Sequence, residues 1–209
     1  MTLATTAPAT DLVTQLAGDG GSSVSMMIGI GIVKDSEAVF FEYVGEKEHK
    51  ALMLPQTGKP LTRIADVQLT GISVAEDIGE FKASKLNLYF TTEAGVTVLI
   101  TSGLTTLWSQ CVLTGLMGLF DSQMLQERLC LDTWKGKNGM RPCFAAIRVR
   151  GQKISDQSMF DQLKESRAAK AADKVKAIMR DAVNILAVAI GCEEAEVAIV
   201  EENETEGDF

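Results

Sequence analysis

The chain has 209 residues, of which 46% are hydrophobic, enough to bury a sizeable core in one domain or one and a half. Its 28 acidic and 20 basic side chains give a net charge of −8, and no apolar run reaches the roughly 18 residues that a membrane span needs. The first residues lack the basic and apolar regions of a secretory signal, so we expect a cytoplasmic protein whose four cysteines are reduced, with Cys111 and Cys130 buried.

The N-terminal part is predicted to contain short strands. Residues 1–23 are rich in Thr, Ala, Gly and Ser and are expected to form a flexible arm. Two or three strands are then expected within residues 24–54, separated by turns at 34–36 and 45–48. The stretch PQTGKP, with Pro55 and Pro60, breaks the pattern and is the best internal boundary, so residues 24–60 form an N-terminal strand extension.

Residues 61–154 show a change of hydrophobic period between strands and a helix. Alternating apolar residues and turn signals predict five strands, and Leu104–Phe120 repeats apolar residues at helical spacing, with Trp108 in the core. The expected strands are Val67–Asp77 with a bulge at Gly71, Lys85–Phe90, Val96–Ser102, Glu127–Trp134 and Cys143–Gly151. An Asn138–Gly139 turn joins the last two strands, because Asn-Gly between β-like runs is a strong hairpin signal.

This order of three strands, one helix and two strands resembles the OB-fold, a five-stranded Greek-key barrel. The resemblance covers about 90 residues and is one of topology. The expected fold is therefore mainly β with α: an OB-like five-stranded barrel, the N-terminal strand extension and a long C-terminal helix.

The C-terminal part combines an amphipathic helix with an acidic tail. Asp156 is a plausible N-cap and Gly191 a stop, so residues 155–192 form one long helix or two shorter ones, whose apolar stripe would allow homo-oligomerisation. Residues 193–209 hold eight of the 28 acids and no Lys or Arg, so the rest of the chain is neutral overall. Such a segment is expected to be disordered, serving either solubility or interaction.

The residues give little support for an enzyme. The single histidine, His49, lies in a charged loop, and the cysteines form no C-x-x-C pair that would indicate zinc. Gly29 and Gly31 begin a G-x-G pattern, but no third glycine or phosphate-binding lysine follows at the expected spacing. We therefore expect no catalytic residue, no metal and no cofactor.

The most basic strand-rich window, between Leu125 and Ile154, indicates nucleic-acid binding. It holds seven Lys or Arg and two acids, with Trp134 beside the cations of the predicted hairpin. Single-strand binding combines such cations, which follow phosphates, with aromatic rings, on which bases stack. The candidate nucleic-acid-binding residues are Trp134, Lys135, Lys137, Arg141, Arg148, Arg150 and, as a possible stacking group, Tyr89.

Structural alternatives exist for the same residues. Trp134 would otherwise cover the end of the barrel, and Arg148 and Arg150 would be ordinary solvated strand residues. If Ile147 and Val149 face the core, the two arginines lie side by side on the opposite face.

An acidic tail that closes on Gly207, Asp208 and Phe209 after an OB-like body is similar to the single-stranded DNA-binding proteins of bacteria and short-tailed phages. In that family the tail recruits replication and repair proteins and competes with DNA for the basic groove. The resemblance implies partner binding by Glu206, Asp208 and Phe209.

The sequence therefore predicts single-stranded DNA binding in replication, recombination or repair. The alternative is a non-enzymatic protein-interaction or assembly scaffold that uses the sheet and the C-terminal helix.

Overall fold

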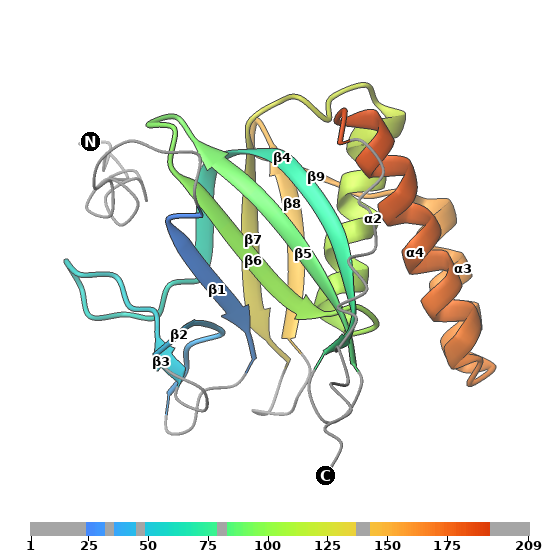
Figure 1. Cartoon of the computed structure of the whole chain (residues 1–209), viewed down its shortest axis with the longest axis horizontal. Coiled ribbons are helices and arrows are strands. Elements are labelled where there is room, and N and C mark those ends of the chain that lie inside the picture. The colour runs from blue at the N-terminus through green and yellow to red at the C-terminus, as the bar shows by residue number, and fades with distance from the viewer. Residues whose placement is uncertain (1–23, 32–35, 45–48, 79–82, 137–142, 193–209) are drawn as a thin grey trace, which may run out of the picture.

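The computed structural model describes residues 24–31, 36–44, 49–78, 83–136 and 143–192, and it confirms a fold that is mainly β with α. The described strands form one nine-stranded sheet in the order β3-β2-β1-β6-β5-β4-β7-β8-β9. Helices α2, α3 and α4 lie together on one side of this twisted sheet (Figure 1). The predicted turns at 34–36, 45–48 and Asn138–Gly139 lie wholly or largely outside the described residues.

The elements follow the predicted order, except that β4 begins four residues earlier than predicted and that the short strand β9 was not predicted. The strands are β1 (Met26–Ile30), β2 (Phe40–Tyr43), β3 (His49–Ala51), β4 (Arg63–Ile78), β5 (Ala83–Thr92), β6 (Thr97–Gly103), β7 (Leu129–Lys135), β8 (Cys143–Val149) and β9 (Gln152–Ile154), and the helices are α2 (Leu107–Asp121), α3 (Gln157–Ala168) and α4 (Ala172–Ala189). Helix α2 begins later than predicted because the Thr106 side chain caps it by accepting a hydrogen bond from the backbone N–H of Ser109.

Strands β4, β5, β6, β7 and β8 are neighbours in the open sheet, and the predicted closed five-stranded barrel is not confirmed. Strand β4 pairs antiparallel with β5 and β7, β5 pairs with β6, and β7 pairs with β8. The remaining edge of β6 pairs in parallel with β1. Strands from both sides of the PQTGKP stretch thus share one open sheet.

The C-terminal helical region consists of two helices, one of the two arrangements that the sequence left open. Lys170, between α3 and α4, has a positive φ of 54°, which a continuous helix does not allow. The predicted boundary residues are confirmed, since the Asp156 carboxylate caps α3 and Gly191 follows α4 with φ 75°.

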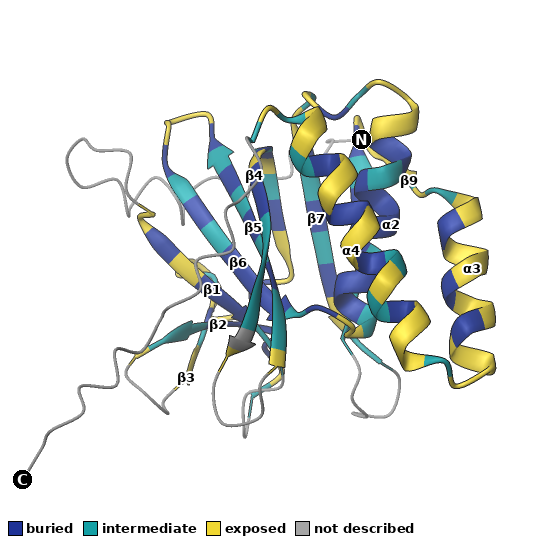
Figure 2. Ribbon diagram, turned by 45° about the vertical axis from the view of Figure 1, so that its right-hand side comes forward, coloured by how far each residue is buried: buried dark blue, intermediate teal, exposed yellow. Residues whose placement is uncertain are grey.

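Alternation along the strands separates two faces of the sheet (Figure 2). The inner face packs on α2: Leu88, Ile100 and Ile147 join Trp108 and Val112 in one buried core. We call the opposite side the outer face. The prediction that Trp108 is a core residue is confirmed, since only 1% of it is exposed, and its indole N–H donates to Thr133 Oγ1 at 3.1 Å.

All four cysteines are free thiols. The prediction that Cys111 and Cys130 are buried is wrong, because both are only partly buried. Cys130 lies on the outer face, between two inward residues of β7, Leu129 and Leu131. The alternation that buries those two leucines therefore turns the thiol away from the core.

Candidate nucleic-acid interface

Five of the predicted site residues belong to the described part of the chain: Trp134, Lys135, Arg148, Arg150 and Tyr89. The others lie outside it, namely Lys137 and Arg141 of the predicted hairpin and Glu206, Asp208 and Phe209 of the tail. Among the described residues, the candidate interface therefore consists of strand residues and the turn that follows β8.

Trp134 and Arg148 share the outer face of the β7–β8 pair. Trp134 lies opposite Phe144, and Arg148 lies opposite Cys130, four residues along each strand. Trp134 is 44% exposed, and its ring stacks beside that of Phe144 at a centroid distance of 6.3 Å and an interplanar angle of 20°. The end of β7 and the start of β8 thus carry two nearly parallel rings, Trp134 and Phe144, outside the core.

The carboxylate of Asp132 holds two arginines on this face. Arg63, which lies opposite Asp132 on β4, donates from Nε at 2.5 Å and from Nη2 at 3.1 Å. Arg148 donates from Nε to Asp132 Oδ2 at 2.8 Å, the oxygen that also accepts from Arg63 Nη2. The side chains of Arg63 and Arg148 remain 53% and 38% exposed. One acid therefore orients two guanidinium groups that carry a surplus positive charge on an accessible surface.

The ionisation of this cluster follows from its contacts. Burial alone would raise the pKa of Asp132, but the hydrogen bonds and charges of Arg63 and Arg148 outweigh it, and the pKa is lowered. In return, the hydrogen bond to Asp132 raises the pKa of Arg63. At neutral pH the cluster therefore contains one carboxylate and two guanidinium ions.

Two other described cations of the basic window, Lys135 and Arg128, contact the protein itself. The Lys135 ammonium donates to the carbonyl of Ser36 at 2.7 Å and lies 3.5 Å from Glu37, with only 14% of its side chain exposed. Arg128 donates to the carbonyl of Asp66 at 2.7 Å. Glu37, which lies outside the window in sequence, therefore offsets part of the positive charge that the window suggests.

Arg150 does not lie beside Arg148 on β8. The predicted inward direction of Ile147 and Val149 is confirmed, since both are buried, but β8 ends at Val149. Arg150 has a positive φ of 50° in the following turn, and its guanidinium pairs with Glu127 at 2.8 Å. The turn thus separates the two arginines that simple alternation places together.

Tyr89 lies on the outer face of β5, while Phe90 is fully buried, as the alternation predicts. The Tyr89 ring packs over Gly71, where an added Cβ would lie 3.1 Å from the ring. The register shift next to Gly71 confirms the predicted bulge. Strand β4 connects the two parts of the face, because Arg63 lies near its start and Gly71 near its middle.

Sequence reasoning missed Arg63, Asp132 and Phe144. Alternation with Trp134 places Asp132 on the outer face, and this signal was present in the sequence. Arg63 gave no such signal, since 69 residues separate it from Asp132 and it lies outside the basic window. Arg63 lies opposite Asp132 only because β4 pairs with β7.

Other chemistry near the interface is limited. Burial raises the pKa of the Cys143 thiol, which favours the protonated form over a nucleophilic thiolate. Within the described ranges, no group of three or more His, Cys, Asp or Glu residues is placed to hold a metal ion. None of the described helices is long and apolar enough to cross a membrane.

Comparison with known proteins gives no relative: no family model, curated protein or solved structure matches the chain. The geometry of the outer face is therefore the basis for the function proposed below.

Proposed function

We propose that this protein binds single-stranded DNA on the outer face of its sheet, in replication, recombination or repair. The observation that carries the proposal is the cluster in which Asp132 orients Arg63 and Arg148, on the same face as the paired rings of Trp134 and Phe144. Guanidinium groups bind phosphate oxygens in bidentate fashion, and aromatic rings stack with any base. The two groups together suit a strand whose bases are exposed.

The proposal includes an OB-like arrangement of β4 to β8. In OB-folds the second and third strands form part of the ligand-binding face, and these correspond here to β5 and β6. Tyr89 projects from the outer face of β5, where a base could stack on its ring. The acidic residues 193–209, by resemblance, dock partner proteins through Glu206, Asp208 and Phe209.

The proposal is tested by fluorescence anisotropy of labelled oligo-dT with the full-length protein across a range of salt concentrations. We expect binding that weakens as salt rises, because phosphate contacts release counterions. Replacing both Arg63 and Arg148 by Ala should weaken binding and reduce the slope of log K against log salt by about 0.7 for each lost contact.

Lys164→Ala is the control for this experiment, because Lys164 is an exposed cation on α3. It should leave both affinity and slope unchanged. Binding by the wild type that does not depend on salt, or an equal loss in Lys164→Ala and the double arginine variant, would contradict the proposal.

A second candidate function, a protein-interaction or assembly scaffold, is supported by an apolar groove between the C-terminal ends of α2 and α4. The groove is lined by Phe120, Asn184, Ile185, Val188 and Ala189. Val188 is 72% exposed, although burial of such a side chain would be favourable. Absence of oligo-dT binding together with self-association would favour this function.

A further inference from the structure

A row of side chains crosses the outer face from β5 to the edge strand β3. Cross-strand pairing aligns, in this order, Tyr89, Leu99, Met27, Tyr43 and His49. The β1–β2 register, continued by one residue, brings Met27 opposite Tyr43. We call these five residues the cross-strand row.

The end of the row on β2 and β3 is a preformed aromatic platform. The His49 ring stacks on Phe41 at a centroid distance of 4.2 Å and meets the edge of Tyr43 at 5.3 Å. Phe41 is 6% exposed and packs against Gly29, where its ring leaves no room for a Cβ. The buried Phe41 therefore contacts both rings, since it also meets Tyr43 edge-on at 5.2 Å, and Met27, 42% exposed, continues the surface.

The lack of described carboxylates around the cross-strand row favours a polyanion as its ligand. On the outer face of β5, β6, β1, β2 and β3, the described side chains include no carboxylate, although the chain has 28 acidic residues. Glu42 belongs to the opposite face of β2, and Lys85 lies on the outer face of β5. Burial raises the pKa of Tyr43, so its ring stays neutral at physiological pH.

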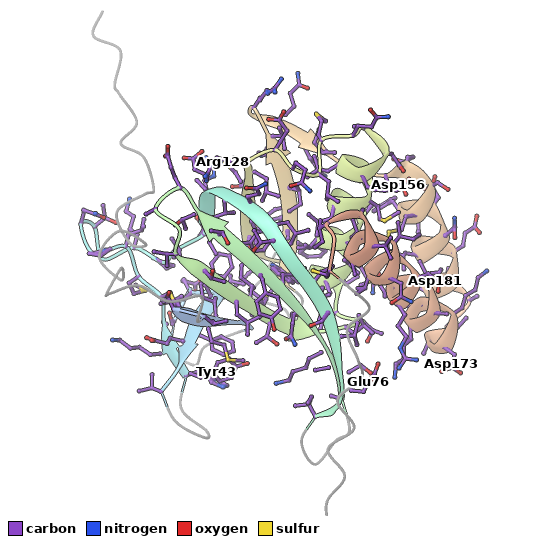
Figure 3. All side chains as sticks on the ribbon, turned by 45° about the horizontal axis from the view of Figure 1, so that its top comes forward. Tyr43, Glu76, Arg128, Asp156, Asp173 and Asp181 are labelled. Atoms are coloured by element: carbon purple, nitrogen blue, oxygen red, sulfur yellow. The ribbon has the colours of Figure 1, made fainter. Side chains whose placement is uncertain are left out.

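The position of the row connects it to the proposed DNA-binding face. Tyr89 belongs to both, and four strand spacings of about 4.8 Å place His49, on β3, roughly 19 Å from β5. Single-strand-binding sites extend over about 4–16 nucleotides per OB-fold, so a bound strand has the length to reach it. Figure 3 shows Tyr43 on the N-terminal strands, away from the helical layer that carries Asp173 and Asp181.

We propose that Tyr43 and His49, together with Met27, form a second base-stacking subsite for single-stranded DNA. The subsite rests on the proposed function and extends it from the OB-like strands to the N-terminal extension. Among the described residues, this face of β5, β6, β1, β2 and β3 carries no carboxylate. This favours a nucleic acid over a protein as the partner, since a protein contact gives no reason to exclude carboxylates from one face of five neighbouring strands.

The test uses the full-length protein and fluorescein-labelled oligo-dT of 16 nucleotides at low salt. Tyr43→Leu and His49→Leu should each weaken binding several-fold, and the double variant on the order of tenfold, because stacking is lost. Tyr43→Phe keeps the ring and should bind like the wild type. Phe160→Leu, at an aromatic residue of α3 that is 42% exposed, is the matched control and should also bind normally.

Photo-cross-linking to an oligonucleotide that contains 5-iodouracil locates the contact independently of protein stability. Mass spectrometry of the wild-type adduct should identify Met27, Tyr43 or His49, and this measurement carries the test if a leucine variant fails to fold. Salt-dependent binding that needs Arg63 and Arg148 but is unchanged in the double leucine variant would overturn the subsite alone and assign the row to a protein contact. Absence of oligo-dT binding by the wild type would overturn both proposals.

Discussion

Asp132 connects three strands of the outer face through one carboxylate. It lies on β7, and it accepts hydrogen bonds from Arg63 of β4 and Arg148 of β8. The side chain of Asp132 is only 16% exposed, so its charge depends on the two arginines for compensation. The residue therefore contributes both to the stability of the sheet and to the orientation of the proposed phosphate-binding groups.

We expect Asp132→Asn to lower the free energy of unfolding by about 1 kcal/mol at pH 7, because partly exposed ion pairs contribute little individually. Since the folded-state pKa of Asp132 is lowered, its contribution is complete above the unfolded pKa of about 3.9 and is lost as pH falls through the folded pKa. The difference between wild type and variant should therefore shrink in acid.

Urea unfolding at a series of pH values measures this difference. Glu127→Gln is the control, because Glu127 pairs with a single arginine whose side chain is 75% exposed. A destabilisation of Asp132→Asn that stays constant down to pH 2 would show that the carboxylate charge is not its cause.

Helix α2 and the segment between β9 and α3 are packed closely enough to exclude a methyl group. A Cβ at Gly118 would lie 2.8 Å from the carbonyl carbon of Ser155 and 2.9 Å from the backbone nitrogen of Asp156. That segment is also held by a hydrogen bond from the Asp156 N–H to the Thr114 carbonyl at 2.8 Å. Glycine is thus required at position 118 because a Cβ would clash with this backbone segment, and not because of its backbone angles.

Gly118→Ala should destabilise the protein although alanine favours helices. The gain in helix propensity is about 1 kcal/mol, whereas overpacking against rigid backbone costs about 1–3 kcal/mol. Chemical unfolding measures the net effect, with Asn184→Ala at an exposed position of α4 as the control for propensity alone. A variant more stable than the wild type would contradict this packing argument.

At the scale of the element, the strands agree with the sequence pattern except at their ends. Alternation of apolar residues predicts β5 and β6 and the buried side of each, because side-chain direction in a strand depends only on neighbouring residues. The same rule misplaces Arg150, because β8 ends at Val149 and Arg150 lies in the following turn with a positive φ. Local pattern gives the face of a strand but not its last residue.

At the scale of the whole molecule, the excess negative charge belongs to residues 193–209, and residues 1–192 hold equal numbers of acids and bases. A chain ending at Gly191 should bind oligo-dT several-fold more tightly at low salt, because the negative field that opposes DNA is removed. The two forms should converge at high salt, where charges more than about 10 Å apart are screened.

A full-length variant in which the eight tail acids are replaced by Gln or Asn separates charge from length. It should match the truncated protein in salt titrations followed by fluorescence anisotropy. Tighter binding by the truncated form alone would show that the tail acts by something other than charge.

The sequence by itself determined the order of β4 to β8 with α2 among them, the caps at Asp156 and Gly191 and the outward direction of Tyr89, because each depends on residues close along the chain. The tertiary structure decided that β1 occupies the edge of β6 and that Arg63 meets Asp132 across 69 residues. It also aligned His49 and Tyr43 with Tyr89 through Met27 and Leu99. These contacts depend on which strands pair, and strand pairing is set by the packing of the whole chain.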